Sequence, residues 1–325
     1  MDRRHFCFTS SALALAAFKL HAAEPFPTKS VRIISPYAAG GRPDFQLRQS
    51  GPVLGDALGQ PIVIEKKVGA AGVIAAQYVA QQPPDGYTLL IGSNTHLIQK
   101  ILQPNLRFDP ITDFIAVSNL TSSPTVLVVR TESPYQTLEE LIADAKAKPG
   151  SMNYGSGGIG TSAHLGGATL ASLNRLRAVH IPLKGSVEIA ASLLRGDTQF
   201  AFPVAGTAVP QVKGGRLRAL AVTSRQRLKL LPDVPTLYER LKNELAVQES
   251  WFGLWAPAGT PGEIVTTIHA AVSKTVRTLS VQTAFEAAGN KATLSESPQA
   301  FAEFVRSENR KWAEIVKLAD ITGGS

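Results

Sequence analysis

The sequence predicts an α/β protein of two lobes, each a sheet flanked by helices, joined by a two-segment hinge. Apolar runs of strand length alternate with helix-like stretches, this pattern occurs twice, and only helix-like sequence follows the turn at 257–261. Such alternation is typical of sheets covered by helices. The chain has 325 residues, and single cores tend to stop growing near roughly 250 to 300 residues. Two lobes therefore fit the length as well as the pattern.

The predicted elements follow the chain in two sets. Apolar runs predict first-lobe strands at Val31–Ser35, 61–65, 88–92 and 114–117. The second set predicts strands at 125–129, 152–154, 179–181, 199–202 and Leu217–Val222, with helices at Leu138–Ala147 and 189–194. An aromatic strand at 251–255 and helices at 263–278, 281–288 and 298–319 return to the first lobe.

The two lobes and their hinge follow from this order. The first lobe is expected to comprise 24–122 plus 224–325, and the second 123–223. The chain would then pass between the lobes twice, near 119–123 and again near 223–250.

Residues 1–23 predict a cleaved export signal. A basic start with Arg3 and Arg4 precedes a short apolar run, and Ala22 or Ala23 supplies the small residue at the cleavage point. The arginine pair resembles a twin-arginine leader but also occurs in ordinary secretory leaders, so both export routes stay open. We expect a periplasmic protein. Cys7 is the only cysteine and lies in the leader, so the mature chain would form no disulfide and no thiolate site.

Composition indicates a soluble globular protein with no nucleic-acid partner. Hydrophobic residues make up 44% and charged residues 18%, and the formal net charge is +8. The basic residues are dispersed and show no basic-aromatic pattern, so a solvated surface accounts for most of this charge. An anionic ligand is compatible with it.

Two glycine-rich turns, at 35–41 and 154–164, each stand between a strand-like run and a helix-like run. Glycine lets a ligand approach the backbone, and the free N–H groups of a helix start favour an anion. Ser156, Thr161 and Ser162 add hydroxyl donors to the second turn. The alternative is a capped glycine turn without a ligand. Two cradles in two lobes predict one anionic ligand between them.

Other kinds of site are disfavoured by the same residues. The glycine spacing at 155–160 matches a dinucleotide turn, but the next strand lacks the acidic residue that holds a ribose, so no cofactor is expected. Ser156 or Ser162 with His164 could form a hydrolase pair, and so could Ser93 with His96, yet no nucleophile elbow occurs. The histidines show no metal-ligand spacing. Asp44 fits either a helix start or a ligand contact.

Nearly the whole mature chain resembles the periplasmic solute-binding proteins of tripartite tricarboxylate transporters, the Bug or TctC-like family. The segments that carry this resemblance are 35–44, 83–90, 108–114, 153–165, 182–185, 213–224, 231–236 and 251–261. The resemblance implies a periplasmic binding protein-like (type II) clamshell that closes on a small mono-, di- or tricarboxylate. It also implies delivery of this anion to two membrane subunits of a cation-coupled importer, with no chemistry done on it.

In similar proteins the first glycine loop holds one carboxylate through backbone amides, and the second loop approaches from the other lobe. Carried onto this chain, and joined to the residues argued above, the resemblance implies a ligand site formed by Tyr37, Ala38, Ala39, Gly40, Gly41, Arg42, Asp44, Ser93, Ser156, Gly160, Thr161, Ser162, His164 and Pro203.

Departures from the family pattern fall within this predicted site. Ala39 replaces the usual proline, Arg42 and Pro43 replace small or hydroxyl residues, and Pro203 stands where an Asp-Asn pair is common. Loss of that polar pair favours a less polar, for instance aromatic, carboxylate over an amino acid. Arg42 adds a cation at the mouth of the site. An exported hydrolase or transferase using the loop from Ser156 to His164, and a receptor for a sensor system, remain alternatives. We expect a monomer.

Overall fold

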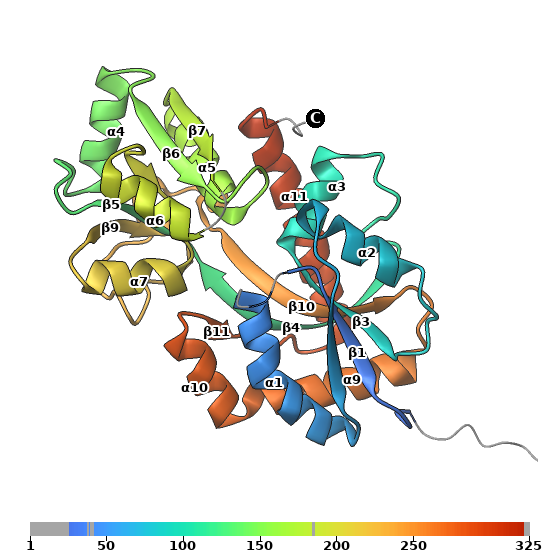
Figure 1. Cartoon of the computed structure of the whole chain (residues 1–325). Coiled ribbons are helices and arrows are strands. Elements are labelled where there is room, and N and C mark those ends of the chain that lie inside the picture. Colours follow the sequence, from blue (N-terminus) through green and yellow to red (C-terminus); the bar gives the residue numbers. More distant parts are fainter. Residues whose placement is uncertain (1–25, 38, 40–41, 184–185, 322–325) are drawn as a thin grey trace, which may run out of the picture.

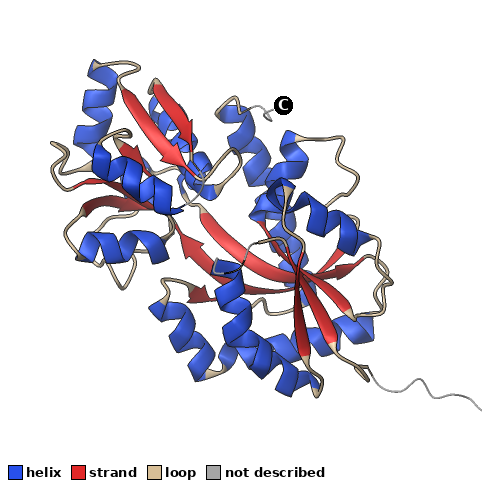
Figure 2. Ribbon diagram, viewed as in Figure 1, coloured by secondary structure: helices blue, strands red, loops and turns tan. Residues whose placement is uncertain are grey.

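The computed structural model describes residues 26–37, 39, 42–183 and 186–321. The predicted leader, with its cleavage point, lies outside these residues. The described chain forms two mixed sheets, each flanked by helices, so the predicted α/β class is confirmed. Figures 1 and 2 show the two sheets in separate halves of the molecule, with long strands running between them.

The first sheet has the strand order β11-β4-β10-β3-β1-β2. β1, β2 and β3 are parallel, and β10 runs antiparallel to both β3 and β4. The strands are β1 (Val31–Ser35), β2 (Ile62–Lys66), β3 (Thr88–Ser93), β4 (Phe114–Pro124), β10 (Glu249–Pro257) and β11 (Lys291–Ala292).

Helices cover both faces of this sheet and divide its core in two. One apolar cluster joins the sheet to α1 (Arg42–Leu58) and α9 (Gly262–Arg277). The other joins it to α2 (Val73–Ala80), α3 (Asn94–Leu102) and α11 (Pro298–Leu318). The short helices η1 (Ala70–Gly72) and α10 (Leu279–Ala287) complete this half.

The second sheet has the strand order β7-β6-β8-β5-β9 and a single apolar core. Its strands are β5 (Val126–Arg130), β6 (Met152–Ser156), β7 (Ala178–Pro182), β8 (Phe200–Ala201) and β9 (Leu217–Val222). Its helices are α4 (Leu138–Ala147), α5 (Ser162–Asn174), α6 (Ser186–Arg195) and α7 (Ala205–Lys213), and α8 (Leu237–Leu241) and η2 (Glu244–Ala246) follow β9.

Local sequence explains where the helices begin. At the start of α4, Thr137 Oγ1 accepts the Glu140 N–H at 3.2 Å, and the Glu140 carboxylate accepts the Thr137 N–H at 3.3 Å. This reciprocal pair satisfies amides that a helix start otherwise leaves unbonded. Ser297 caps α11 by accepting the Ala300 N–H at 3.0 Å, and Pro298 follows at the first helical position. The buried apolar residues of α11 recur at helical spacing, at Phe301, Val305, Trp312 and Ile315.

The chain passes between the sheets at two places that bond to each other. β4 continues through Thr125 into β5, and the segment from Thr223 to Gln248 leads from β9 back to β10. Thr125 N–H donates to Thr223 Oγ1 at 2.9 Å, and Gln248 N–H donates to the Thr223 carbonyl at 2.9 Å. These passages lie at or next to the predicted hinge segments. The exact lobe boundaries stay a prediction.

β4 and β10 are both longer than their apolar runs predicted. The run at 114–117 extends as a strand to Pro124, through a polar stretch that apolar periodicity does not detect. β10 supplies the missing partner, because it pairs with β4 from Phe114 to Pro124 across two register shifts. Backbone pairing therefore continues where side-chain pattern ends.

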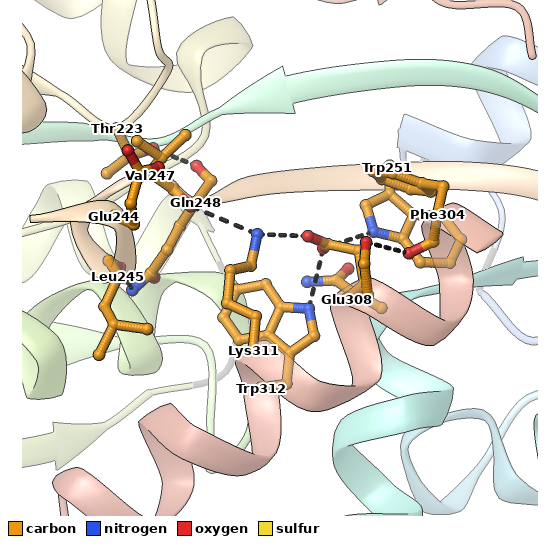
Figure 3. A network of polar contacts seen from close by, with 12 residues as sticks. Thr223, Glu244, Leu245, Val247, Gln248, Trp251, Phe304, Glu308, Lys311 and Trp312 are labelled. Atoms are coloured by element: carbon orange, nitrogen blue, oxygen red, sulfur yellow. Dashed lines mark hydrogen bonds and ion pairs between the residues drawn. The ribbon is translucent and has the colours of Figure 1, made fainter.

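A buried polar network joins α11 to the returning passage (Figure 3). Glu308 Oε2 accepts the indole N–H of Trp251 at 2.9 Å and that of Trp312 at 3.0 Å. The other carboxylate oxygen pairs with Lys311, whose ammonium also donates to the Val247 carbonyl at 3.3 Å. Glu308 is buried, so these partners offset the cost of removing its charge from water.

Candidate functional site

The first glycine loop follows β1 and meets the start of α3. The Tyr37 hydroxyl and Ser93 Oγ lie 2.8 Å apart. Ser93 caps α3 by accepting the Thr95 N–H at 3.2 Å, and His96 Nδ1 accepts the Ser93 N–H at 3.1 Å. Burial lowers the pKa of His96 to about 4, so the ring is neutral and can accept this bond. Two predicted residues, Tyr37 and Ser93, are thus brought together at the carboxyl ends of neighbouring parallel strands.

Part of the predicted first loop cannot be placed. Ala38, Gly40 and Gly41 lie outside the described residues, so their predicted backbone contacts with a ligand stay a prediction. Ala39, between them, is exposed.

Arg42 begins α1 and lies against β10. Its Nη2 donates to Ser250 Oγ at 2.6 Å, and its guanidinium carbon lies 4.8 Å from the centre of the Phe252 ring. Nη1 is buried and has no hydrogen-bond partner. No carboxylate in the described part of the chain forms an ion pair with Arg42. Burial lowers the pKa of Arg42 to about 10, so the guanidinium remains a cation at neutral pH.

Asp44, two residues further into α1, holds the helix to the sheet. Its two carboxylate oxygens pair with Arg48 and with Lys66 of β2, each at 2.9 Å. The side chain is buried. These pairs favour the helix-start role that the sequence left open, and a ligand contact by Asp44 stays a prediction.

The second glycine loop is held by hydrogen bonds within its own half. Ser156 ends β6, is fully buried, and its Oγ lies 2.6 Å from His180 Nε2 and accepts the Gly158 N–H at 3.1 Å. Thr161 caps α5 by accepting the His164 N–H at 3.3 Å, and it donates to the Gly158 carbonyl at 2.8 Å. Gly160 has a φ of +78°, which glycine adopts without strain.

A pair of stacked histidines supports this loop. The rings of His164 and His180 have centroids 4.0 Å apart, and His164 Nδ1 accepts the Gly160 N–H at 3.2 Å. Burial, with a smaller effect of His180, lowers the pKa of His164 to about 4. Both rings support loop geometry in their neutral form.

The serine–histidine pairing expected by the hydrolase alternative is different in the structure. Ser156 bonds to His180, on β7, and His164 Nδ1 is occupied by a backbone N–H. Sequence reasoning missed His180 as a partner of this loop. The only sequence feature that could have indicated His180 was its place on β7, the strand that pairs in parallel with β6.

The second glycine loop approaches the start of α3 across the two halves. Asn94 Nδ2 donates to Ser162 Oγ at 3.4 Å. A Cβ at Gly160 would lie 3.1 Å from the Ile98 side chain of α3, so a larger residue here would require that side chain to shift by a few tenths of an ångström. Asn94 is buried, and its Oδ1 has no partner. The sequence analysis did not select Asn94. The sequence feature that could have indicated Asn94 was its position directly after Ser93, the residue that caps α3.

Pro203 is buried after β8, and its carbonyl accepts the Val126 N–H at 2.9 Å. It therefore lies beside the first passage between the sheets. Its contact with a ligand stays a prediction. Among the described residues, no cluster of three or more His, Cys, Asp or Glu side chains could hold a metal ion.

Comparison with known proteins identifies the family. The profile described as the tripartite tricarboxylate transporter family receptor, TctC, matches residues 47–321. The chain belongs to this receptor family. Its members bind substrates rather than transform them, so the hydrolase or transferase alternative is wrong.

Solved structures agree with this assignment. "Structure of periplasmic binding protein BugD" has a TM-score of 0.78 at 28% identity and covers 91% of this chain and 99% of that one. A structure of MatC from Rhodopseudomonas palustris with bound malate has a TM-score of 0.76 at 30% identity, covering 90% and 100%. A third, R. palustris Rpa4515 with adipate, has a TM-score of 0.80 at 30% identity, covering 91% and 99%. The two-lobed periplasmic binding protein fold predicted from sequence is confirmed.

None of the described helices is both long and apolar enough to cross a bilayer.

Proposed function

We propose that this receptor captures a small organic carboxylate between its two lobes and delivers it to the two membrane subunits of a tripartite importer. The proposed lobes are 24–122 plus 224–325 and 123–223, and they close about the passages at Thr125 and 223–248. The leader directs the chain to the periplasm and is cleaved near Ala22 or Ala23.

One observation carries the proposal: the second glycine loop meets the start of α3 through the bond from Asn94 to Ser162, and the first glycine loop contacts the same helix start through Tyr37 and Ser93. Both loops lead into helix starts, where unbonded N–H groups favour an anion. Tyr37, Ser93 and Thr161 place hydroxyl groups around the same region, and Arg42 adds a cation. This arrangement suits a carboxylate that touches both lobes and keeps them closed.

The ligands of two structural neighbours support a carboxylate. Malate and adipate are both small dicarboxylates, one polar and one with an apolar chain. Among the described residues, Ser93 bonds to Tyr37 and to the His96 ring, Ser156 bonds to His180, and no carboxylate orients either histidine as a base, which fits binding without turnover.

A thermal-shift screen of the mature chain, from about Ala23 onward, tests this function. Mono-, di- and tricarboxylates, aromatic acids, amino acids and nucleotides would be compared. A ligand at about 100 times its dissociation constant stabilises the native state by roughly 2.7 kcal/mol, which raises the melting temperature measurably. We expect a carboxylate class to raise it and to be recovered unchanged.

Failure of every carboxylate to shift the melt, or consumption of the ligand, would contradict the proposal. Uptake of the identified ligand is then compared in cells with and without the gene. Loss of uptake without the gene indicates delivery to an importer, whereas unchanged uptake indicates a receptor for a sensor system. Sedimentation of the purified chain tests the expected monomer.

A further inference from the structure

Arg42 is a cation that the described protein leaves without an anionic partner. Its guanidinium is fixed on both sides, by Ser250 Oγ at 2.6 Å and by the Phe252 ring at 4.8 Å. The other terminal nitrogen, Nη1, is buried and donates to no partner in the described chain. Removing a charge from water without pairing it with an opposite charge is costly. A buried cation without a protein partner therefore suggests that an anion from outside the chain pairs with it.

Among the described residues, no carboxylate is in ion-pair contact with Arg42. Asp44 is engaged by Arg48 and Lys66, and the other ion pairs among the described residues involve neither Arg42 nor its neighbours on β10. Ser250 and Phe252 are buried and uncharged. Within the described part of the chain, the positive charge of Arg42 therefore has no anionic partner.

Arg42 also lies at the proposed ligand site. It is the first residue of α1, directly after the first glycine loop, and the N-terminal end of α1 is directed toward the second half of the molecule (Figure 1). The Phe252 ring that it covers also packs edge-on against Tyr37, with centroids 5.4 Å apart. Arg42, Tyr37 and Ser93 thus form one continuous set of contacts through Phe252 and the Tyr37 hydroxyl.

We propose that Arg42 binds a second carboxylate of the ligand, which makes this receptor selective for dicarboxylates over monocarboxylates of the same skeleton. The inference rests on the proposed function, in which the glycine loops hold one carboxylate. A guanidinium presents its N–H groups in a planar fork that matches a carboxylate, and Nη1 is free to donate. Ser250 and Phe252 hold the fork in place before the ligand arrives, so little side-chain entropy is lost on binding.

Calorimetry with matched ligand pairs tests this selectivity. Adipate is compared with hexanoate, and malate with 3-hydroxybutyrate, because each pair differs by one carboxylate on the same chain. The wild type is expected to bind one of the dicarboxylates at least about 30-fold more tightly than its partner, as a buried charge pair would require. Arg42→Gln should abolish this ratio by weakening the dicarboxylate and leaving the monocarboxylate unchanged.

Two further variants separate charge from shape. Arg42→Lys keeps the cation without the fork and should retain part of the ratio. Arg277→Gln, at an exposed arginine of α9 that forms no ion pair among the described residues, is the control for removal of a positive charge and should keep the full wild-type ratio. Ligand-free Arg42→Gln should unfold at a urea concentration no lower than the wild type, because it removes an unpaired cation.

The outcomes distinguish this inference from the proposed function. Equal binding of both members of each pair by the wild type, or an unchanged ratio in Arg42→Gln, overturns the role of Arg42 and leaves carboxylate capture intact. If no carboxylate binds the wild type, the proposed function fails and the role of Arg42 fails with it. The wild-type comparison needs no variant, so the predicted selectivity for dicarboxylates can be tested even if Arg42→Gln does not fold.

Discussion

His164 shows how a single neutral side chain supports the second glycine loop. Its Nδ1 can accept the Gly160 N–H only while it carries no proton, and the adjacent His180 ring penalises a charge there. A proton on His164 would break the bond and place a cation in a buried position. The loop geometry is thus linked to pH through this residue.

We expect the receptor to lose stability as the pH falls from about 6.5 toward 4. The pKa of His164 is about 4 in the folded chain, below the usual 6.5, so the unfolded state takes up the proton first. The stabilisation is complete above pH 6.5 and decreases by up to about 1.4 kcal/mol per pH unit below it. His96, with a pKa of about 4, adds in the same direction.

Urea unfolding at several pH values measures this slope. His164→Asn keeps an acceptor near the position of Nδ1 but cannot titrate in this range, so its slope should be smaller than that of the wild type. An equal slope in both proteins would assign the acid sensitivity to other groups. Measurements at two salt concentrations separate the contribution of His164 from general charge repulsion, because salt screens that repulsion.

At the scale of elements, the second loop and α3 need glycine at their contact. Gly160→Ala would place a Cβ 3.1 Å from Ile98 and 3.2 Å from Gln99, in addition to straining a backbone with φ of +78°. We expect this variant to bind the carboxylate at least several-fold more weakly, because the second loop and α3 can no longer approach as closely. Calorimetry of the ligand identified in the screen measures the loss.

Gly158→Ala is the matched control for this prediction. Gly158 also has a positive φ, of +114°, but a Cβ there meets nothing within 4 Å. The control therefore carries backbone strain without the clash against α3. Equal losses of affinity in the two variants would show that strain within the loop, rather than contact between the halves, is responsible.

The network around Glu308 anchors α11 to β10 and to the returning passage. Glu308→Ala would leave the indole N–H groups of Trp251 and Trp312 buried without an acceptor, and Lys311 without its ion-pair partner. We expect a loss of roughly 3 kcal/mol in the free energy of unfolding. Urea unfolding followed by tryptophan fluorescence measures it. Glu314→Ala, on the exposed side of α11, should change stability by less than about 0.5 kcal/mol.

At the scale of the whole molecule, the two halves also touch on the side of α7 and α10. A Cβ at Gly206, in α7, would lie 2.3 Å from the Ala288 carbonyl oxygen, and one at Gly289 would lie 2.6 Å from Gly206. Ser123 Oγ donates to the Gly289 carbonyl at 3.1 Å, next to the first passage. Two glycines therefore allow the backbones of the two halves to lie against each other here.

Gly206→Ala cannot keep this contact, because the clash is with backbone and no side chain can move aside. We expect the variant to change the angle between the halves, which small-angle scattering detects as a change in the radius of gyration of the ligand-free chain. Ligand affinity should change with it, since binding selects one arrangement. Gly262→Ala, where a Cβ meets nothing within 4 Å, is the control. If Gly206→Ala shows the same scattering and the same ligand affinity as the wild type, this contact does not set the angle between the halves.

Much of the architecture could be predicted from local sequence. The strand at Val31–Ser35 and the helix at Leu138–Ala147 have the predicted bounds, because apolar period and capping residues act within a few positions of the chain. The extension of β4 to Pro124 could not be predicted, since it depends on pairing with β10, more than a hundred positions away. The two glycine turns could be located from the sequence, whereas the partners of their side chains could not.

By itself, the sequence determined the family, the α/β class, the order of the elements and the two glycine turns, because these depend on composition, period and short motifs. Only the tertiary structure decided that Ser156 bonds to His180 rather than His164, that Asn94 meets Ser162, and that Arg42 rests on Ser250. These contacts join residues that are distant in the chain. Their geometry depends on how the sheets are ordered and how the two halves meet, which no local pattern encodes.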